Sequence, residues 1–541
     1  MPTVSRISPS MWGRIPSCAA VFNRRSGRLE IGPQLGKLPH KGLSKVCLAA
    51  LLAIPCAAAD YFAPSNRLTA IGVDRNDLSD LVLTERIRLM TEAQTFAIMR
   101  DARSLAGAER MTSPKMQKMV RDASARSGVP ASLIAAIAFL ESFGNPAAES
   151  PTGPKGIMQI SAATARTMGL RMVYATRYKT RTERRLVKKK RGKPVYQNVK
   201  VKVPYHVLIH DERLDPARAL PAAARYLAGM EQKFGGLDWA VWAYHCGEGC
   251  VGEFLEMARH AQGLKGDPPS VAQVFFSSSP VHNREIWQAL AEQMERDYSP
   301  TYWFRVRRAE QLLGVYQEDP DEFQRLQEEY RYDFEPLQRA PNRLSVWVKP
   351  QDLTYRTCED VEHDVGTRLV RAMDNSNYFG FQLRRIGYGS LGEFDPEHRD
   401  SYLNATPSAL GTLLTIAFET RRLYDAMKPR HETFMPIEVT GLARPLDYAA
   451  RAGREFATGK AHFDVLCSGQ AFEISLANLP LGERECLRFV LEDIGWLGCL
   501  GFVEETPGSG ALVIGSSPGS RDFFTKVYEE AASAKAPSTS N

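Results

Sequence analysis

The alternation of apolar and polar positions predicts a chain whose first two thirds are mainly helical. The stretch "LIAAIAFLES" (133–142) is apolar on every side until Glu141, as expected of a buried helix, and Gly144 offers a stop signal just beyond it. Between residues 171 and 204 the period changes to two on either side of "RGK", which predicts a β-hairpin. Helical patterns then return and continue to about residue 334.

Breaks in this pattern divide the chain into segments. The segments are a leader (1–59), a helical lead-in (60–113), a helical domain (114–300) with the hairpin inserted at 171–204, a helical connector (301–345), a mixed α/β domain (346–530) and a polar tail (531–541). The boundary before the mixed domain is marked by "APNRLSVWVKP", which interrupts the helical pattern. The sequence therefore predicts an α+β protein of two principal domains.

The excess of basic residues lies outside the expected domains. The 541 residues carry a formal net charge of +7, and residues 1–59 alone account for it with eight Lys or Arg and one acidic residue. Lys41 and Lys45 precede an apolar run that ends in three alanines, the pattern of a secretory signal peptide with cleavage after Ala59. A buried hydrophobic helix is the alternative interpretation. We expect an exported, periplasmic protein.

Six cysteines follow the leader, an even number that permits disulfides in an exported chain. Cys246 and Cys250 are four residues apart and could form a local bridge, while free buried thiols are an equally open interpretation. Neither a CxxC motif nor a Cys/His cluster indicates a structural zinc site, so no metal or other cofactor is expected.

Glu141 is the first candidate for chemistry. A carboxyl at the edge of an apolar helix is desolvated, which favours its neutral form and suits a general acid at neutral pH. The alternative is a glutamate that caps or bridges a helix end.

Three short motifs follow one another in the helical domain: "ES" (141–142), "GIMQI" (156–160) and "AYHCGEG" (243–249). With the helical patterns around them, residues 114–260 resemble the catalytic core of the soluble lytic transglycosylase family, most closely the membrane-bound lytic transglycosylase D group. The resemblance implies a lysozyme-like helical fold. It also implies non-hydrolytic cleavage of the MurNAc–GlcNAc β-1,4 bond of peptidoglycan glycan strands, with 1,6-anhydro-MurNAc ends as products.

The resemblance also assigns roles to residues. Glu141 would donate a proton to the leaving glycosidic oxygen and then accept one from the muramoyl C6 hydroxyl. The expected substrate-binding residues are Ser142, Gly156, Met158, Gln159, Tyr244 and His245, the last standing where the family usually has asparagine.

Two other functions stay open for the same domain. A hydrolytic muramidase would need a second carboxylate, for which Glu149 and Glu248 are the candidates. A peptidoglycan-binding scaffold without turnover is the other alternative.

The predicted hairpin is strongly basic, with 13 Lys or Arg and one acidic residue between positions 171 and 204. We interpret it as a clamp on anionic wall polymer, and a solvated flap is the alternative. Nucleic acid is an unexpected partner for an exported protein.

Residues 434–528 weakly resemble zinc D-Ala-D-Ala carboxypeptidases. Four positions match that pattern, namely Arg444, Gly469, Ala471 and Phe472. Leu466, Glu473 and Ala511 stand where the resemblance places the metal-ligand positions, and His462 is the only histidine beyond residue 431. We expect a metal-free domain able to bind peptide stems, with an unrelated α/β packing domain as the alternative.

Overall fold

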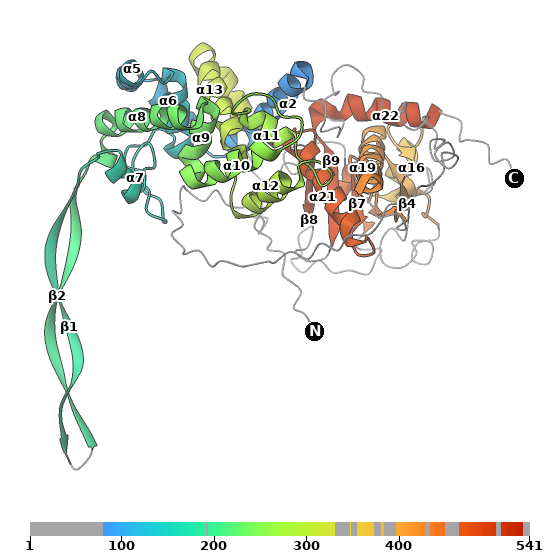
Figure 1. Cartoon of the computed structure of the whole chain (residues 1–541). Helices are drawn as coiled ribbons and strands as arrows, with labels where there is room; N and C mark the ends of the chain where they lie inside the picture. The colour runs from blue at the N-terminus through green and yellow to red at the C-terminus, as the bar shows by residue number, and fades with distance from the viewer. Residues whose placement is uncertain are drawn as a thin grey trace, which may run out of the picture.

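The computed structural model describes residues 79–190, 193–330, 347, 354–372, 380–383, 397–427, 433–448, 465–504 and 510–533. The predicted leader lies outside these residues. Figure 1 shows a helical half, a long hairpin that projects from it, and a half built around a β-sheet. The expected α+β class is confirmed. None of the described helices is both long and apolar enough to cross a bilayer.

The helical half contains thirteen described α-helices. They are α2 (Asp80–Ala93), α3 (Thr95–Met99), α4 (Ser104–Thr112), α5 (Pro114–Ser127), α6 (Ala131–Ser142), α7 (Ala162–Thr167), α8 (Pro216–Phe234), α9 (Leu237–Cys246), α10 (Glu248–His260), α11 (Val271–Phe276), α12 (Arg284–Arg296), α13 (Tyr302–Glu318) and α14 (Pro320–Tyr330).

Helix α6 lies at the centre of this half, as its uniformly apolar sequence predicts. Ile134, Ile137 and Phe139 are fully buried, and α6 shares one hydrophobic core with α5, α8 and α13. The helix ends where Phe143 adopts a left-handed backbone (φ 52°) and the Gly144 amide donates to the carbonyl of Ala138. Glu141 is therefore held one residue before the end of a largely buried helix.

The hairpin consists of β1 (Met172–Lys190) and β2 (Lys193–Asp211), paired antiparallel from Met172↔Asp211 to Lys190↔Lys193. The predicted hairpin is confirmed, but its second strand continues to residue 211 instead of ending near 204. The additional residues pair with the start of β1, with one register shift between Val173 and Tyr174, so the turn to helix α8 comes later. Figure 1 shows this ribbon extending far from the helical half.

The other half contains a five-stranded sheet in the order β4-β6-β7-β9-β8. Its strands are β4 (Phe381–Leu383), β6 (Ile437–Gly441), β7 (Ala471–Ser475), β8 (Leu500–Glu504) and β9 (Ala511–Ser516). Strand β4 is parallel to β6, and the other neighbours are antiparallel. A separate short pair joins β3 (Val370–Arg371) to β5 (Asn404–Ala405).

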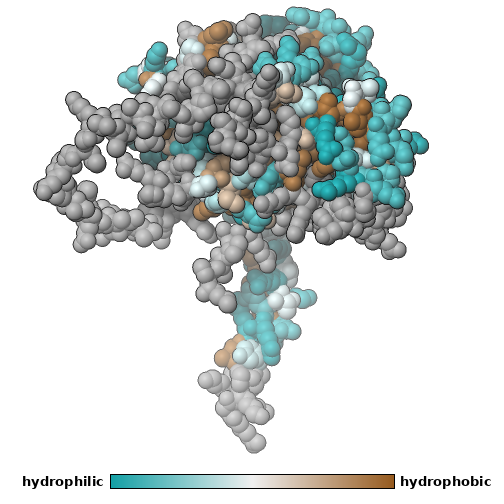
Figure 2. Space-filling view, turned by 90° about the vertical axis from the view of Figure 1, so that its right-hand side faces the viewer, coloured by the Kyte–Doolittle hydropathy of each residue, from teal (hydrophilic) through white to brown (hydrophobic). Residues whose placement is uncertain are grey.

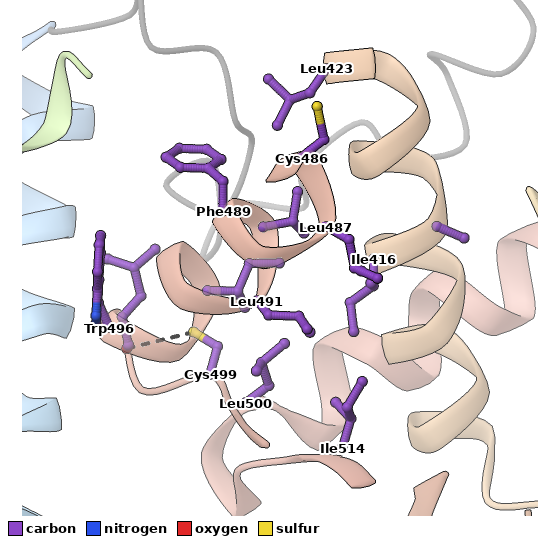
Figure 3. Packing of buried hydrophobic residues seen from close by; sticks show 14 of the residues in the cluster. Ile416, Leu423, Cys486, Leu487, Phe489, Leu491, Trp496, Cys499, Leu500 and Ile514 are labelled. Atoms are coloured by element: carbon purple, nitrogen blue, oxygen red, sulfur yellow. Dashed lines mark hydrogen bonds between the residues drawn. The ribbon is translucent and has the colours of Figure 1, made fainter. Parts of the chain in front are cut away.

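Four helices accompany the sheet: α16 (Cys358–Asp364), α19 (Pro407–Met427), α21 (Leu481–Trp496) and α22 (Arg521–Ser533). In Figure 3, Ile416 of α19 points toward Leu487 of α21, and Leu500 and Ile514 approach from β8 and β9. These side chains are fully buried, so the two helices and the sheet enclose one core.

The two halves pack directly against each other through aromatic side chains. Phe275 of α11 lies 4.9 Å from Trp496 of α21 between ring centroids, and Trp287 of α12 lies 6.1 Å from Phe489. Arg284 of α12 also forms an ion pair with Glu485 at 2.6 Å. Because buried aromatic contacts contribute most of the energy of such interfaces, we treat the halves as docked rather than loosely linked.

Candidate active site

Glu141 contacts Tyr302, a residue 161 positions later in the sequence of the helical half. The hydroxyl of Tyr302 donates a hydrogen bond of 2.6 Å to Glu141 Oε1. Tyr302 begins α13 and is fully buried, whereas Glu141 is half-buried. A short bond from a hydroxyl to a carboxyl is strong, and it fixes the orientation of the acid.

Tyr302 is itself held in a cluster of near-parallel rings. The imidazole of His245 stacks on Tyr302 with centroids 4.4 Å apart and 11° between the planes, and it stacks on Tyr298 at 4.7 Å. The guanidinium of Arg305 lies 3.8 Å from the centroid of the Tyr298 ring. This cluster restrains the tyrosine that binds Glu141.

Burial lowers the pKa of His245 to about 4, an effect that Asp297 opposes and Arg305 reinforces. His245 is therefore neutral near pH 7. The observed ring contacts of His245 are with the two tyrosines.

Directly after His245, a disulfide joins Cys246 to Cys250, which confirms the local bridge. It ties the end of α9, where Tyr244 and His245 lie, to the first turn of α10. Cys486 and Cys499 in the other half are buried thiols.

The loop that carries "GIMQI" takes a shape that its own residues determine. Gly156 has φ +80°, and a Cβ there would lie 1.8 Å from the carbonyl oxygen of Arg213, so the position requires glycine. Gln159 is buried with φ +43°, and its side-chain nitrogen donates to the carbonyls of Ala148 (3.2 Å) and Gly156 (2.9 Å). Its amide thus holds the loop that it belongs to.

Two other predicted residues tie this loop to the helices. The hydroxyl of Ser142 donates to the carbonyl of Ile157 at 2.8 Å, and that of Tyr244 donates to the carbonyl of Met158 at 2.7 Å. The side chain of Met158 is fully buried in the core. The structure therefore brings the predicted residues together around one loop, and their contact with substrate remains a prediction.

The alternative carboxylates have cationic partners. Glu149 accepts from Lys155 at 2.7 Å, and Glu248 pairs with Lys233. Both pairs are largely solvent-exposed, which is typical of surface charges.

Sequence reasoning missed Tyr302. It lies 161 residues after Glu141, within the segment expected to be a connector, yet α13 packs in the same core as α6. A helix start at "SPTYWF" was readable from the pattern, but the partner of the tyrosine was not.

The hairpin is anchored to the same loop. The buried guanidinium of Arg213 binds Asp211, the last residue of β2, at 2.7 Å and donates to the carbonyl of Ile160 at 3.1 Å. Burial works against the Asp211 carboxylate, but the hydrogen bonds from Arg213 prevail and lower the pKa of Asp211. The base of the ribbon is thus fixed to the "GIMQI" loop.

In the sheet half, Glu473 of β7 accepts from Arg444 Nη2 at 2.8 Å and from the Thr440 hydroxyl at 2.7 Å. Leu466 is fully buried, and Ala511 begins β9. Within the described ranges no group of three or more His, Cys, Asp or Glu side chains is arranged to hold a metal ion. His462 lies outside the described residues.

Comparison with known proteins finds similarities within the helical half. Residues 118–187 and 196–265 match the family model "Transglycosylase SLT domain". Over 127 residues the chain is 33% identical to Peptidoglycan transglycosylase gp16 of Escherichia phage T7, covering 23% of this chain and 7% of that protein. Over 215 residues it is 23% identical to Membrane-bound lytic murein transglycosylase F 2 of Alkalilimnicola ehrlichii, covering 38% of each. The matched region therefore spans well under two thirds of either relative.

Proposed function

The chain belongs to the transglycosylase SLT domain family through residues 118–187 and 196–265, and on that premise we propose that it is a peptidoglycan lytic transglycosylase. It cleaves the MurNAc–GlcNAc β-1,4 bond without water and leaves 1,6-anhydro-MurNAc ends. The observation that carries this proposal is the 2.6 Å hydrogen bond from Tyr302 to Glu141, the latter lying within the residues that match the family model.

The geometry suits an acid that changes protonation state twice. The Tyr302 hydroxyl donates to Oε1 and orients the carboxyl of Glu141, which we assign to deliver the proton to the leaving glycosidic oxygen. As Glu141 becomes a carboxylate, the hydrogen bond from Tyr302 strengthens and stabilises it. The same carboxylate then takes the proton of the muramoyl C6 hydroxyl, whose oxygen closes on the anomeric carbon.

A neutral donor matters for this cycle. The Tyr302 hydroxyl is a neutral donor to Glu141, and the neutral imidazole of His245 stacks behind the tyrosine ring. The ion pairs of Glu149 and Glu248 also favour the non-hydrolytic route, since a hydrolase needs a second carboxylate to activate water.

We propose an extracytoplasmic, periplasmic location, in keeping with the substrate and with the signal-like pattern before residue 60. The sheet half is proposed to contact peptide stems, and the basic hairpin to contact anionic wall polymer. No cofactor takes part in the proposed reaction.

The decisive experiment is digestion of purified sacculi followed by mass spectrometry of the released fragments. Wild type is expected to release 1,6-anhydro products, and Glu141→Gln to reduce their rate of release by at least about 100-fold, because the general acid is lost. Glu149→Gln is the matched control and should retain activity, since Glu149 is exposed and paired with Lys155.

Equal release of anhydro products by Glu141→Gln and wild type would disprove the proposal. Products with reducing ends instead of anhydro ends would assign the chain to the hydrolytic muramidases. Binding without release by the wild type would favour the inactive scaffold.

A further inference from the structure

We propose that the β1–β2 hairpin is a second binding surface for the polymeric substrate, and that an acidic peptidoglycan strand contacts both of its faces outside the cleavage site. This inference rests on the proposed function, because it takes the substrate to be peptidoglycan. It adds a site that none of the sequence motifs for catalysis includes.

The described side chains of the ribbon are mostly exposed, and its sequence is strongly basic. Nineteen residues in each strand make it about 60 Å long. Its charge comes from 13 Lys or Arg and one acidic residue between positions 171 and 204. Figure 2 shows it projecting from the body as a mainly hydrophilic arm with isolated hydrophobic residues. A surface of this kind attracts polyanions.

The strand register distributes that charge over both faces. Directly paired residues lie on the same face, and successive residues along a strand alternate between faces. Lys200 and Lys202 of β2 pair with Thr182 and Thr180, which places these two cations on one face.

The opposite face has its cations on the other strand. Lys179 and Arg181 of β1 pair with Val203 and Val201 of β2. In this part of the ribbon each face therefore carries two cations beside uncharged partners, and the two basic rows lie on different strands.

This arrangement distinguishes between possible partners. A flat bilayer can meet only one face of a two-stranded ribbon, which would leave the other basic row unused. A flexible acidic chain can follow the twist of the ribbon and neutralise both rows. Peptidoglycan has this chemistry, since its peptide stems carry carboxylates along a flexible polymer.

Exposed aromatic rings supply apolar contact surface between the cations. Tyr178 and Tyr205 are 65% and 39% exposed, and the guanidinium of Arg184 lies 4.5 Å from the ring centroid of Tyr196. Tyrosine offers a rigid ring for the apolar face of a sugar and a hydroxyl for hydrogen bonding. The mixture of rings and cations fits an acidic glycan better than a simple polyanion.

The base of the ribbon explains how such a surface serves the same substrate. Asp211 and Arg213 connect the end of β2 to the carbonyl of Ile160, next to Gln159 of the "GIMQI" loop. A peptidoglycan chain that passes the "GIMQI" loop can therefore continue along the ribbon. We infer that the hairpin retains the uncut polymer while Glu141 acts on one bond.

The test measures binding of the full chain to sacculi stripped of covalently attached accessory polymers, at low and at high salt. All variants carry Glu141→Gln, so that the polymer stays intact. One variant adds Lys200→Gln and Lys202→Gln, a second adds Lys179→Gln and Arg181→Gln, and a third combines the two pairs.

Each pair should weaken binding at low salt about threefold, and the combined variant about tenfold, because four modest charge contacts are lost. The difference should shrink at high salt. The charge-keeping control Lys200→Arg with Lys202→Arg should bind like its parent.

Unchanged binding by the combined variant would overturn the inference. An effect of only one face would indicate a flat partner, and anionic phospholipid vesicles would then be the probe that binds. An effect seen with untreated sacculi but lost with stripped ones would assign the hairpin to an accessory polymer instead. Since binding is measured without turnover, these results are independent of whether Glu141 proves to be the catalytic acid.

Discussion

The two halves of the molecule each present a glutamate that sequence motifs single out, and they treat it in opposite ways. Glu141 of the helical half receives a hydrogen bond from the neutral hydroxyl of Tyr302. Glu473 of the sheet half receives one from the guanidinium of Arg444, with both side chains nearly buried. A hydroxyl donor is compatible with a carboxyl that releases and regains a proton, whereas the ion pair of Glu473 with Arg444 joins two segments of the sheet half. The difference agrees with the proposed acid–base role of Glu141.

The largest expected effect concerns the ion pair. Arg444→Met leaves the buried Glu473 carboxylate without its cation, and we expect a loss of about 3–5 kcal/mol in the free energy of unfolding. Denaturant unfolding followed by tryptophan fluorescence measures it. Release of anhydro products by the folded variant should match wild type.

Glu473→Gln is the matched control for that variant. The amide oxygen of the introduced glutamine can still accept the hydrogen bond from the Thr440 hydroxyl. A loss of glycan cleavage in folded Arg444→Met protein would break the proposed division of labour between the halves.

His245, which stacks on the tyrosine that binds Glu141, gives the ring cluster a pH dependence that can be measured. Its pKa is about 4 in the fold and about 6.5 when unfolded, so the unfolded chain binds the proton more readily. The contribution of His245 to the free energy of unfolding is fully present above pH 6.5. It falls as the pH drops toward 4, by up to about 3 kcal/mol. His245→Asn should remove this pH-dependent part, as measured by thermal unfolding between pH 4 and pH 8. Equal slopes for wild type and variant would contradict the assignment.

Glu483 in the sheet half gives the opposite pH dependence of stability. Burial raises its pKa to about 7, although the Met435 amide donates to the carboxylate and opposes the shift. Its neutral form stabilises the fold fully below about pH 4.5, and this contribution is lost as the pH rises through 7. Glu483→Gln keeps an acceptor for Met435 and should be about 2 kcal/mol more stable than wild type at pH 8. Unfolding at pH 5, where the two proteins should differ little, is the control.

The smallest expected effect is at the proposed catalytic centre. Tyr302→Phe keeps the ring that stacks on His245 and removes the hydroxyl that binds Glu141. Turnover should fall about tenfold, the equivalent of one charge-assisted hydrogen bond of roughly 1.4 kcal/mol, with unchanged binding to sacculi. Tyr298→Phe is the control, because its ring stacking survives. Full activity in Tyr302→Phe would remove the tyrosine from the mechanism.

Much of the local structure was readable from the chain alone. The apolar run before Glu141 predicted the buried helix α6 and its end at Gly144, and the period of two predicted the hairpin. The four-residue spacing of Cys246 and Cys250 allowed the bridge that forms. These features depend on residues within one or two turns of each other, where spacing and backbone preference are sufficient.

Only the tertiary structure decided what surrounds the acid. The contact of Tyr302 with Glu141, the bond from Arg213 to Ile160 and the packing of Trp496 on Phe275 join residues that are 53 to 221 positions apart. The pattern of one segment fixes which face of a helix is buried, but not which distant side chain meets it. Tertiary packing selects those partners: the packing of α13 on α6 places Tyr302 beside Glu141, and the pairing of β6 with β7 places Arg444 near Glu473.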